Sequence, residues 1–199
     1  MRAGALRKKA ASRPVVPGIL LAIVALSLLG CQGEPSTPAI DAAELLLGAA
    51  AYPPGWELCE SGKYLAGEAS PNLTEGAEEV AFQAFCFTMP EARSGQRVYR
   101  FRDKRKAAGE YREFERVFFS GDWQIPDDLL RASEAANQWR VGCSDQRYQD
   151  ETICFFLGQY EEYLVFFSAT IVRQGQELVT TTELASLLRE IDQKMAGRR

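Results

Sequence analysis

The side chains that could carry acid-base chemistry in this 199-residue chain are carboxylates, because the chain contains no histidine. Without histidine, Ser-His-Asp and Cys-His nucleophile systems and the usual general base near neutral pH are excluded. Glu161 and Glu162, with Glu110 and Glu113, are paired acids of the kind that a glycosidase uses. Adjacent strand residues point to opposite faces, so Glu161 and Glu162 would not converge on one substrate. We therefore expect no enzyme activity, with a carboxylate-based hydrolase as the weaker alternative.

The five cysteines are the second group of reactive side chains. Cys31 follows an apolar segment, whereas Cys59, Cys86, Cys143 and Cys154 are distributed along the rest of the chain. An even number of cysteines in an oxidising compartment predicts two disulfides, for which the sequence alone permits three pairings. The alternative is a zinc ion bound by the four thiolates, but the close Cys-x-x-Cys pairs that are typical of zinc sites are missing. We expect disulfides and neither a metal nor another cofactor.

The first thirty residues have the layout of a secretory signal peptide. Five basic residues and no acid precede the apolar segment 19–29, which is shorter than the roughly twenty residues of a membrane-spanning helix. The segment ends in Leu28-Leu29-Gly30-Cys31, which resembles the lipobox of bacterial lipoproteins. The resemblance implies cleavage between Gly30 and Cys31 and acylation of the Cys31 thiol. Leu29 departs from the pattern, because a smaller residue is commoner there. A plain secretory leader and a membrane span remain the alternatives.

The lipoprotein resemblance divides the chain into a signal peptide (1–30), a lipidated cysteine with a flexible tether (31–39) and one extracytoplasmic domain (40–199). The tether is polar and contains two prolines. Its lipid implies a bacterial membrane as partner, since two or three acyl chains anchor a protein stably. From Cys31 onward the chain has 18 basic and 27 acidic residues, a net charge of −9. Such an acidic domain is a poor partner for nucleic acid.

Hydrophobic periodicity predicts an α+β domain, an antiparallel sheet covered by helices. We expect turns at 63–76 and 90–96. A capping box, Thr180 with Glu183, predicts the start of the last helix. The other predicted helices are 41–51, one that starts at Asp103 and continues to about 118, and 127–137. The predicted strands are 56–59, 80–88, 98–101, 139–143, 153–158 and 163–173.

Short motifs recur in the two halves of the domain. The segment 56–59 (Trp-Glu-Leu-Cys) is similar to 139–143 (Trp-Arg-Val-Gly-Cys), and 85–87 (Phe-Cys-Phe) to 153–155 (Ile-Cys-Phe). Either the domain is a diverged internal duplication or the similarity is due to chance. A duplication would pair Cys59 with Cys86 and Cys143 with Cys154.

The domain loosely resembles the extracytoplasmic sensor-like domains of bacterial lipoproteins and kinase ectodomains. The resemblance rests on these recurring motifs, on a Leu-rich first helix and on the sequence Pro53-Pro54-Gly55-Trp56. The similarity implies a small α+β domain with two disulfides, and it assigns no binding residues. Together with the absence of a catalytic motif, it leads us to expect a non-catalytic binding or sensor-like domain.

Three further groups of residues could form ligand-binding sites. A basic run could bind an anionic headgroup or glycan, or simply be solvated. The acidic loop 144–151 could hold Ca²⁺ or be an ordinary hairpin tip. A group of aromatic residues could line the pocket of an apolar-ligand carrier or pack as core. The basic run consists of Arg97, Arg100, Arg102, Lys104, Arg105 and Lys106, and the aromatic group of Phe82, Phe85, Phe87, Phe118, Phe119, Phe155, Phe156, Phe166 and Phe167.

Overall fold

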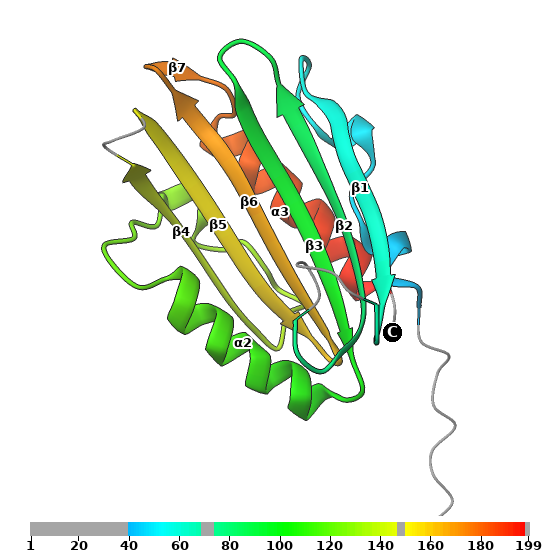
Figure 1. Cartoon of the computed structure of the whole chain (residues 1–199). Coiled ribbons are helices and arrows are strands. Elements are labelled where there is room, and N and C mark those ends of the chain that lie inside the picture. Colours follow the sequence, from blue (N-terminus) through cyan, green and yellow to red (C-terminus); the bar gives the residue numbers. More distant parts are fainter. Residues whose placement is uncertain (1–39, 69–73, 147–149, 198–199) are drawn as a thin grey trace, which may run out of the picture. The chain divides into compact units, whose positions relative to one another are not determined.

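The computed structural model describes residues 40–68, 74–146 and 150–197. The chain divides into two units, Met1–Ala39 and Ile40–Arg199. The predicted signal peptide, the tether, Gly30 and Cys31 all lie outside the described residues. The described helices and strands belong to the second unit (Figure 1).

One antiparallel sheet forms the second unit, with the strand order β1-β2-β3-β6-β5-β4 and a short β7 that pairs with β6. Two three-stranded meanders therefore meet where β3 pairs with β6. With its helices, this sheet confirms the predicted α+β class. The strands are β1 (Glu57–Leu65), β2 (Ala77–Phe87), β3 (Ala92–Phe101), β4 (Gln138–Gln146), β5 (Glu151–Tyr160), β6 (Tyr163–Arg173) and β7 (Gln176–Glu177).

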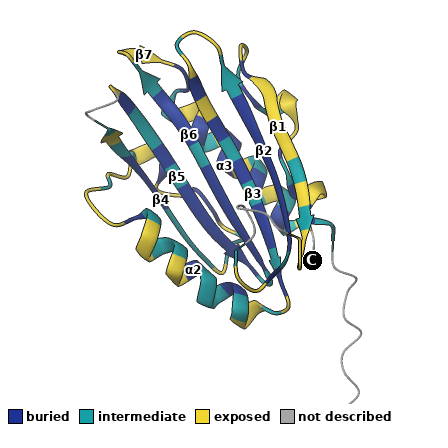
Figure 2. Cartoon of the chain, in the orientation of Figure 1, coloured by how far each residue is buried: buried dark blue, intermediate teal, exposed yellow. Residues whose placement is uncertain are grey.

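Two α-helices among the described residues, α2 (Lys104–Phe118) and α3 (Thr181–Ala196), lie on opposite faces of the sheet (Figure 1). Alternation along the central strands supplies a core to each face. Val98 and Phe167 pack in the core on the α3 side, whereas Tyr99 and Phe166 pack in the core on the α2 side. Figure 2 shows that the central strands are mostly buried, whereas β1 at the edge is mostly exposed.

Both helices begin where their capping residues predict. Asp103 accepts a hydrogen bond from the backbone N–H of Lys106 at 2.8 Å, which caps α2. Thr180 and Glu183 form the reciprocal capping box of α3. The predicted apolar stripe of α3 is buried against the sheet: Leu184, Leu187, Leu188, Ile191 and Met195.

The helix expected at 41–51 is instead two short 3₁₀ helices, η1 (Ala42–Leu45) and η2 (Ala49–Ala51). The backbone between them bonds to two buried glutamines of the sheet. Gln96 accepts from the Leu47 N–H at 2.8 Å, and Gln83 donates to the Leu47 carbonyl at 2.8 Å. These side chains take the place of helical hydrogen-bond partners, so a continuous helix is not needed to satisfy the backbone.

The helix expected at 127–137 is a single 3₁₀ turn, η3 (Asp127–Leu129). Asp192 of α3 accepts hydrogen bonds from the backbone N–H groups of Glu134 and Ala135, at 3.0 and 3.1 Å. A tertiary carboxylate thus binds donors that a helix would have used internally. The turns expected at 63–76 and 90–96 are also shorter than predicted, because β1 continues to Leu65 and β3 begins at Ala92.

Each half of the domain contains three strands followed by a helix, and the structure contains the disulfides Cys59–Cys86 and Cys143–Cys154. The element order expected of a duplication is therefore present, but the geometry is not two-fold symmetric. A two-fold axis that exchanges the antiparallel strands β3 and β6 is perpendicular to the sheet and keeps equivalent helices on one face, whereas α2 and α3 lie on opposite faces. Both disulfides also lie toward the same end of the sheet, since the row that contains Cys154 passes through Ala169 and Ser94 to Phe85, next to Cys86.

Candidate functional site

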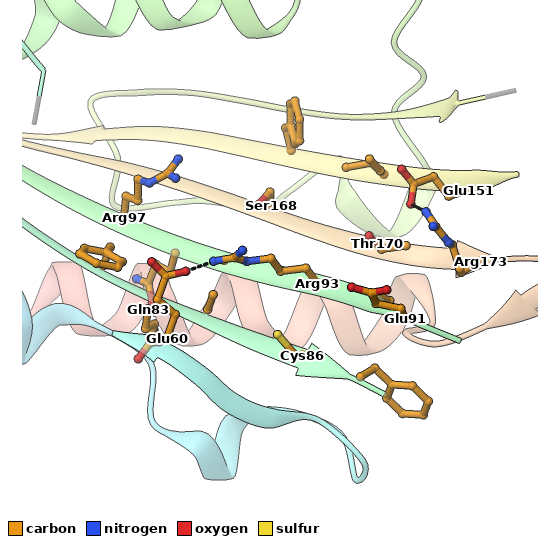
Figure 3. A pocket seen from close by; sticks show the side chains of 18 of the residues that line it. Glu60, Gln83, Cys86, Glu91, Arg93, Arg97, Glu151, Ser168, Thr170 and Arg173 are labelled. Atoms are coloured by element: carbon orange, nitrogen blue, oxygen red, sulfur yellow. Dashed lines mark hydrogen bonds and ion pairs between the residues drawn. The ribbon is translucent and has the colours of Figure 1, made fainter. Parts of the chain in front are cut away.

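A hollow of about 990 Å³ lies on the face of the sheet that carries α2 (Figure 3). Phe155 and Phe166 line it and also pack against Phe118 of α2, with ring centroids 6.0 and 4.5 Å from the Phe118 ring. We call this space the sheet hollow. It lies on the same face of the sheet as α2, next to the core that α2 forms with the sheet.

Small side chains at the same level of three neighbouring strands form the floor of the sheet hollow. Ala84 of β2 is paired with Gly95 of β3, and Gly95 is paired with Ser168 of β6. A Cβ atom on Gly95 would lie 3.6 Å from both the Gln83 carbonyl and Ser168 Oγ, which is ordinary contact. Space above Gly95 is thus available in the fold, and a larger side chain there would point into it.

Two ion pairs stand at the sides of the sheet hollow. Arg93 of β3 pairs with Glu60 of β1, and both side chains are largely exposed. Arg173 of β6 pairs with Glu151 of β5, whose side chain is only 6% exposed. In Figure 3, Glu151 and Arg173 lie toward one end of the sheet hollow and Arg97 lies at the other, with Ser168 and Thr170 between them.

Arg97 differs from these two arginines because it forms no ion pair with any residue in the described part of the chain. Its β-sheet neighbours in the same row are Phe82 and Phe166, and its side chain is half-buried. Burial raises the pKa of the nearby Tyr99 hydroxyl, while the Arg97 charge and a hydrogen bond with the Arg97 side chain act in the opposite direction. Tyr99 therefore stays neutral near neutral pH and does not balance the charge of Arg97.

One further donor faces an incomplete environment. The Nε atom of Arg173 is buried and has no hydrogen-bond partner among the described residues, although the same guanidinium binds Glu151 through Nη1. Buried donors without a partner cost free energy, so an acceptor placed here would be stabilising. Glu91, which lines the same end, gives this end a second carboxylate.

The predicted site residues are placed as follows. Cys86 lines the sheet hollow through the Cys59–Cys86 disulfide at the exposed edge, whereas Cys143 and Cys154 are buried in the core on the α3 side. Of the basic run, Arg97 alone lines the sheet hollow. Others are engaged in ion pairs elsewhere: Arg100 with Glu78 and Glu79, Arg102 with Asp103, Lys104 with Glu161, and Lys106 with Glu110.

The proposed acidic pairs do not assemble into a catalytic site. Glu113 pairs with Arg116 on its own helix, as Glu110 does with Lys106, while Glu161 lies in the turn between β5 and β6 and binds Asn137 and Lys104. In the loop considered for Ca²⁺, residues 147–149 lie outside the described residues, and Glu151 is held by Arg173. The described residues contain no group of three or more cysteines or acids placed to hold a metal ion.

The aromatic residues are divided between the two faces of the sheet. Phe85, Phe156 and Phe167 belong to the core on the α3 side. The α2 side takes four others: Phe118, Phe119, Phe155 and Phe166. The sheet hollow is lined by Phe82, Phe87, Phe155 and Phe166. Phe155 and Phe166 therefore both pack in the core on the α2 side and line the sheet hollow.

The sheet hollow is not apparent from the sequence alone. Its floor depends on the register of three strands, two of which are far apart in the sequence, so Ala84 and Ser168 could not be brought together in advance. One local signal was present: Arg93, Gly95 and Arg97 alternate on one face of β3. Reading 90–96 as a turn concealed that alternation.

Within the described residues, no helix is long and apolar enough to cross a bilayer. The two disulfides indicate an oxidising, extracytoplasmic environment. Comparison of the chain with protein-family models, curated proteins and solved structures gives no match.

Proposed function

We propose that the chain is a lipoprotein, anchored to a bacterial membrane through Cys31, whose domain binds a ligand in the sheet hollow without catalysing a reaction. The observation that carries the binding role is the floor of Ala84, Gly95 and Ser168, which leaves a large open space beside aromatic and charged side chains. Concave sites lined by apolar rings and a few polar groups are typical of ligand-binding sites.

The charges in the sheet hollow support binding rather than catalysis. Glu60 and Glu151 are each held in an ion pair with an arginine, so neither faces the open space as a free acid. Acid catalysis by carboxylates needs one group that stays protonated beside one that is ionised. Glu91 is the remaining acid of the sheet hollow within the described part of the chain. The acid at the same end, Glu151, is held by Arg173 and is not free to act together with Glu91.

A carrier of an apolar ligand is the second candidate for the same site. It is favoured by Phe82, Phe155 and Phe166, whose rings line the sheet hollow. The two candidates differ in whether the ligand must carry a charge.

Filling the sheet hollow tests the binding role. Gly95→Leu would place a branched side chain over the floor, where a Cβ makes only ordinary contacts. Gly109→Leu on α2 is the matched control, because a Cβ at Gly109 meets no atom within 4 Å. Small-molecule fractions from the bacterial envelope are screened for a rise in melting temperature. We expect a fraction that stabilises the wild type and the control but not Gly95→Leu; a shift that persists in Gly95→Leu contradicts binding in the sheet hollow.

The anchor has its own test. The intact mass of protein from a bacterial membrane fraction should show the loss of residues 1–30 and the addition of acyl mass. Cys31→Ala should remain uncleaved. A wild-type chain that is processed without acyl mass contradicts the lipoprotein assignment and leaves the binding role unaffected.

A further inference from the structure

We propose that the sheet hollow selects a ligand with one carboxylate and a short apolar body, the carboxylate binding Arg97 and the body lying over the floor against the aromatic rings. The inference rests on the proposed binding role and adds the chemical class and the orientation of the ligand. It depends on three features of the sheet hollow: one cation without an ion pair, a middle with a floor of small side chains and no net charge, and an acidic far end.

The cation without an ion pair is Arg97. An arginine is always charged at physiological pH, and its planar guanidinium can bind both oxygens of a carboxylate. Its row neighbours Phe82 and Phe166 are apolar, so water has limited access to one side of the group. A carboxylate here would replace lost hydration with charge-assisted hydrogen bonds, which are stronger than neutral ones.

The two other arginines of the sheet hollow do not compete for the same anion. Arg93 is neutralised by Glu60, and Arg173 by Glu151. An anion that approached Arg173 would also approach the carboxylates of Glu151 and Glu91. Like charges so close repel, so the anionic end of a ligand is directed toward Arg97.

The middle of the sheet hollow suits an apolar body with a few polar contacts. Ala84 and Gly95 present little more than backbone, and Phe166 and Phe155 supply ring surfaces at one side. At the other side Glu60 is the row neighbour of Ala84, and its charge is balanced by Arg93. Arg97 and Arg93 lie four residues apart on one face of β3, which separates their Cα atoms by about 13 Å. The space between the two arginines holds a phenyl ring with two or three methylene groups. The buried Arg173 Nε beyond it could donate to a neutral acceptor at the far end.

The experiment compares three probes of similar shape and different charge: 3-phenylpropionate, 3-phenylpropionamide and 3-phenylpropylammonium. Dissociation constants are measured by isothermal titration with the full chain, purified without detergent and, if membrane-bound, held in polymer discs with empty discs as the blank. We expect the carboxylate to bind about tenfold or more tightly than the amide, as one hydrogen-bonded charge contact supplies. The ammonium should bind more weakly than the amide.

Variants assign the preference to Arg97. Arg97→Met keeps the length of the side chain and should bind carboxylate and amide equally, while Arg97→Lys should restore part of the preference. Arg102→Met is the control, because Arg102 is exposed and pairs with its neighbour Asp103. A single cooperative thermal transition, like that of the wild type, shows that Arg97→Met is folded.

The outcomes separate this inference from the proposed function. Equal binding of carboxylate and amide to the wild type, abolished by Gly95→Leu, overturns the charge preference and favours an apolar-ligand carrier. A carboxylate preference that survives Arg97→Met also overturns the inference. Binding of any probe that is unaffected by Gly95→Leu overturns the sheet hollow as the site. The failure of all three probes to bind overturns the ligand class inferred here, and the proposed function is then decided by the screen of envelope fractions.

Discussion

Gly95 on β3 and Ser168 on β6 are paired neighbours, and a Cβ atom on Gly95 would lie 3.6 Å from Ser168 Oγ, close enough for contact and too far for a clash. Glycine at this position is therefore not required by local packing. It lowers the strand propensity of β3 and leaves the space above the sheet open. A residue that costs stability and keeps a cavity open supports the binding role proposed for the sheet hollow.

Gly95→Ala should stabilise the domain by about 0.5–1 kcal/mol, because alanine reduces the entropy of the unfolded chain and fits the native backbone. Urea unfolding of the oxidised protein measures the change. Gly158→Ala is the matched comparison on β5, where a Cβ would lie 2.7 Å from the Tyr160 ring and 2.9 Å from the Phe156 ring. That variant should be destabilised. Loss of stability in Gly95→Ala would show that the floor is more tightly packed than described.

Asp192→Ala should destabilise the domain by about 2–3 kcal/mol, because several charge-assisted hydrogen bonds are lost together. The Asp192 carboxylate accepts from the hydroxyl groups of Ser133 and Tyr160 and from the backbone N–H groups of Glu134 and Ala135. It connects α3 to the segment that replaces the predicted helix at 127–137. The free energy of unfolding in urea is the readout.

Asp128→Ala serves as the control for Asp192. Asp128 also accepts from two hydroxyl groups, those of Thr181 and Thr182 at 2.7 and 3.2 Å, but at an exposed position. Its loss should cost less than about 1 kcal/mol. Equal effects of the two substitutions would contradict a special role for Asp192.

Stability should fall in alkali partly because of Tyr52. Burial raises the pKa of the Tyr52 hydroxyl from 10.0 to about 12, and a hydrogen bond with Ser94 acts in the opposite direction. Because the folded pKa exceeds the unfolded value, this contribution is complete below pH 10 and is lost as the pH rises toward 12. Tyr52→Phe should lose less stability between pH 9 and 12 than the wild type, as measured by urea unfolding at each pH. Parallel pH profiles of the two proteins would argue against a buried Tyr52.

The Asp41–Lys63 pair should make a stabilising contribution that is lost in acid rather than in alkali. The hydrogen bond from Lys63, followed by that from the Ala43 N–H, lowers the pKa of Asp41 below 3.8. The stabilising contribution is therefore present above the ordinary pKa and is lost as the pH falls through the lowered one. Lys63→Met should raise the Asp41 pKa, as followed by carboxyl NMR. An unchanged pKa would mean that the pair is not formed in solution.

The two disulfides should differ in their accessibility to reductant. Cys59 is exposed on the edge strand β1, whereas Cys143 and Cys154 are 6% and 1% exposed. Mild treatment of the folded protein with a phosphine, followed by alkylation and peptide mass analysis, should label Cys59 and Cys86 first. Labelling of Cys143 and Cys154 at the same rate would contradict the burial of that bridge.

Local patterns in the sequence were sufficient to predict some elements and not others. Asp103, and Thr180 with Glu183, predicted the starts of α2 and α3, because capping depends on neighbouring residues. The predicted strand 163–173 coincides with β6. The helices predicted at 41–51 and 127–137 were wrong, because side chains that are distant in the sequence bind the backbone there. Gln83 and Gln96 bind the first segment, and Asp192 binds the second.

The disulfide pairing shows that a correct prediction can rest on an incomplete argument. Cys59 does pair with Cys86 and Cys143 with Cys154, as a duplication would require. The halves are nevertheless not related by two-fold symmetry, and the two bridges have different surroundings. Pairing of cysteines on adjacent strands of a meander is sufficient to explain both bridges.

The measurement that tests the central claim most directly is a map of amide NMR shifts on addition of 3-phenylpropionate to the isotope-labelled protein. Binding in the sheet hollow predicts that the largest changes cluster at Gly95, Arg97 and Ser168, with little change in α3 on the opposite face. Changes centred on α3, or scattered without relation to the sheet hollow, would contradict the claim that this hollow is the binding site.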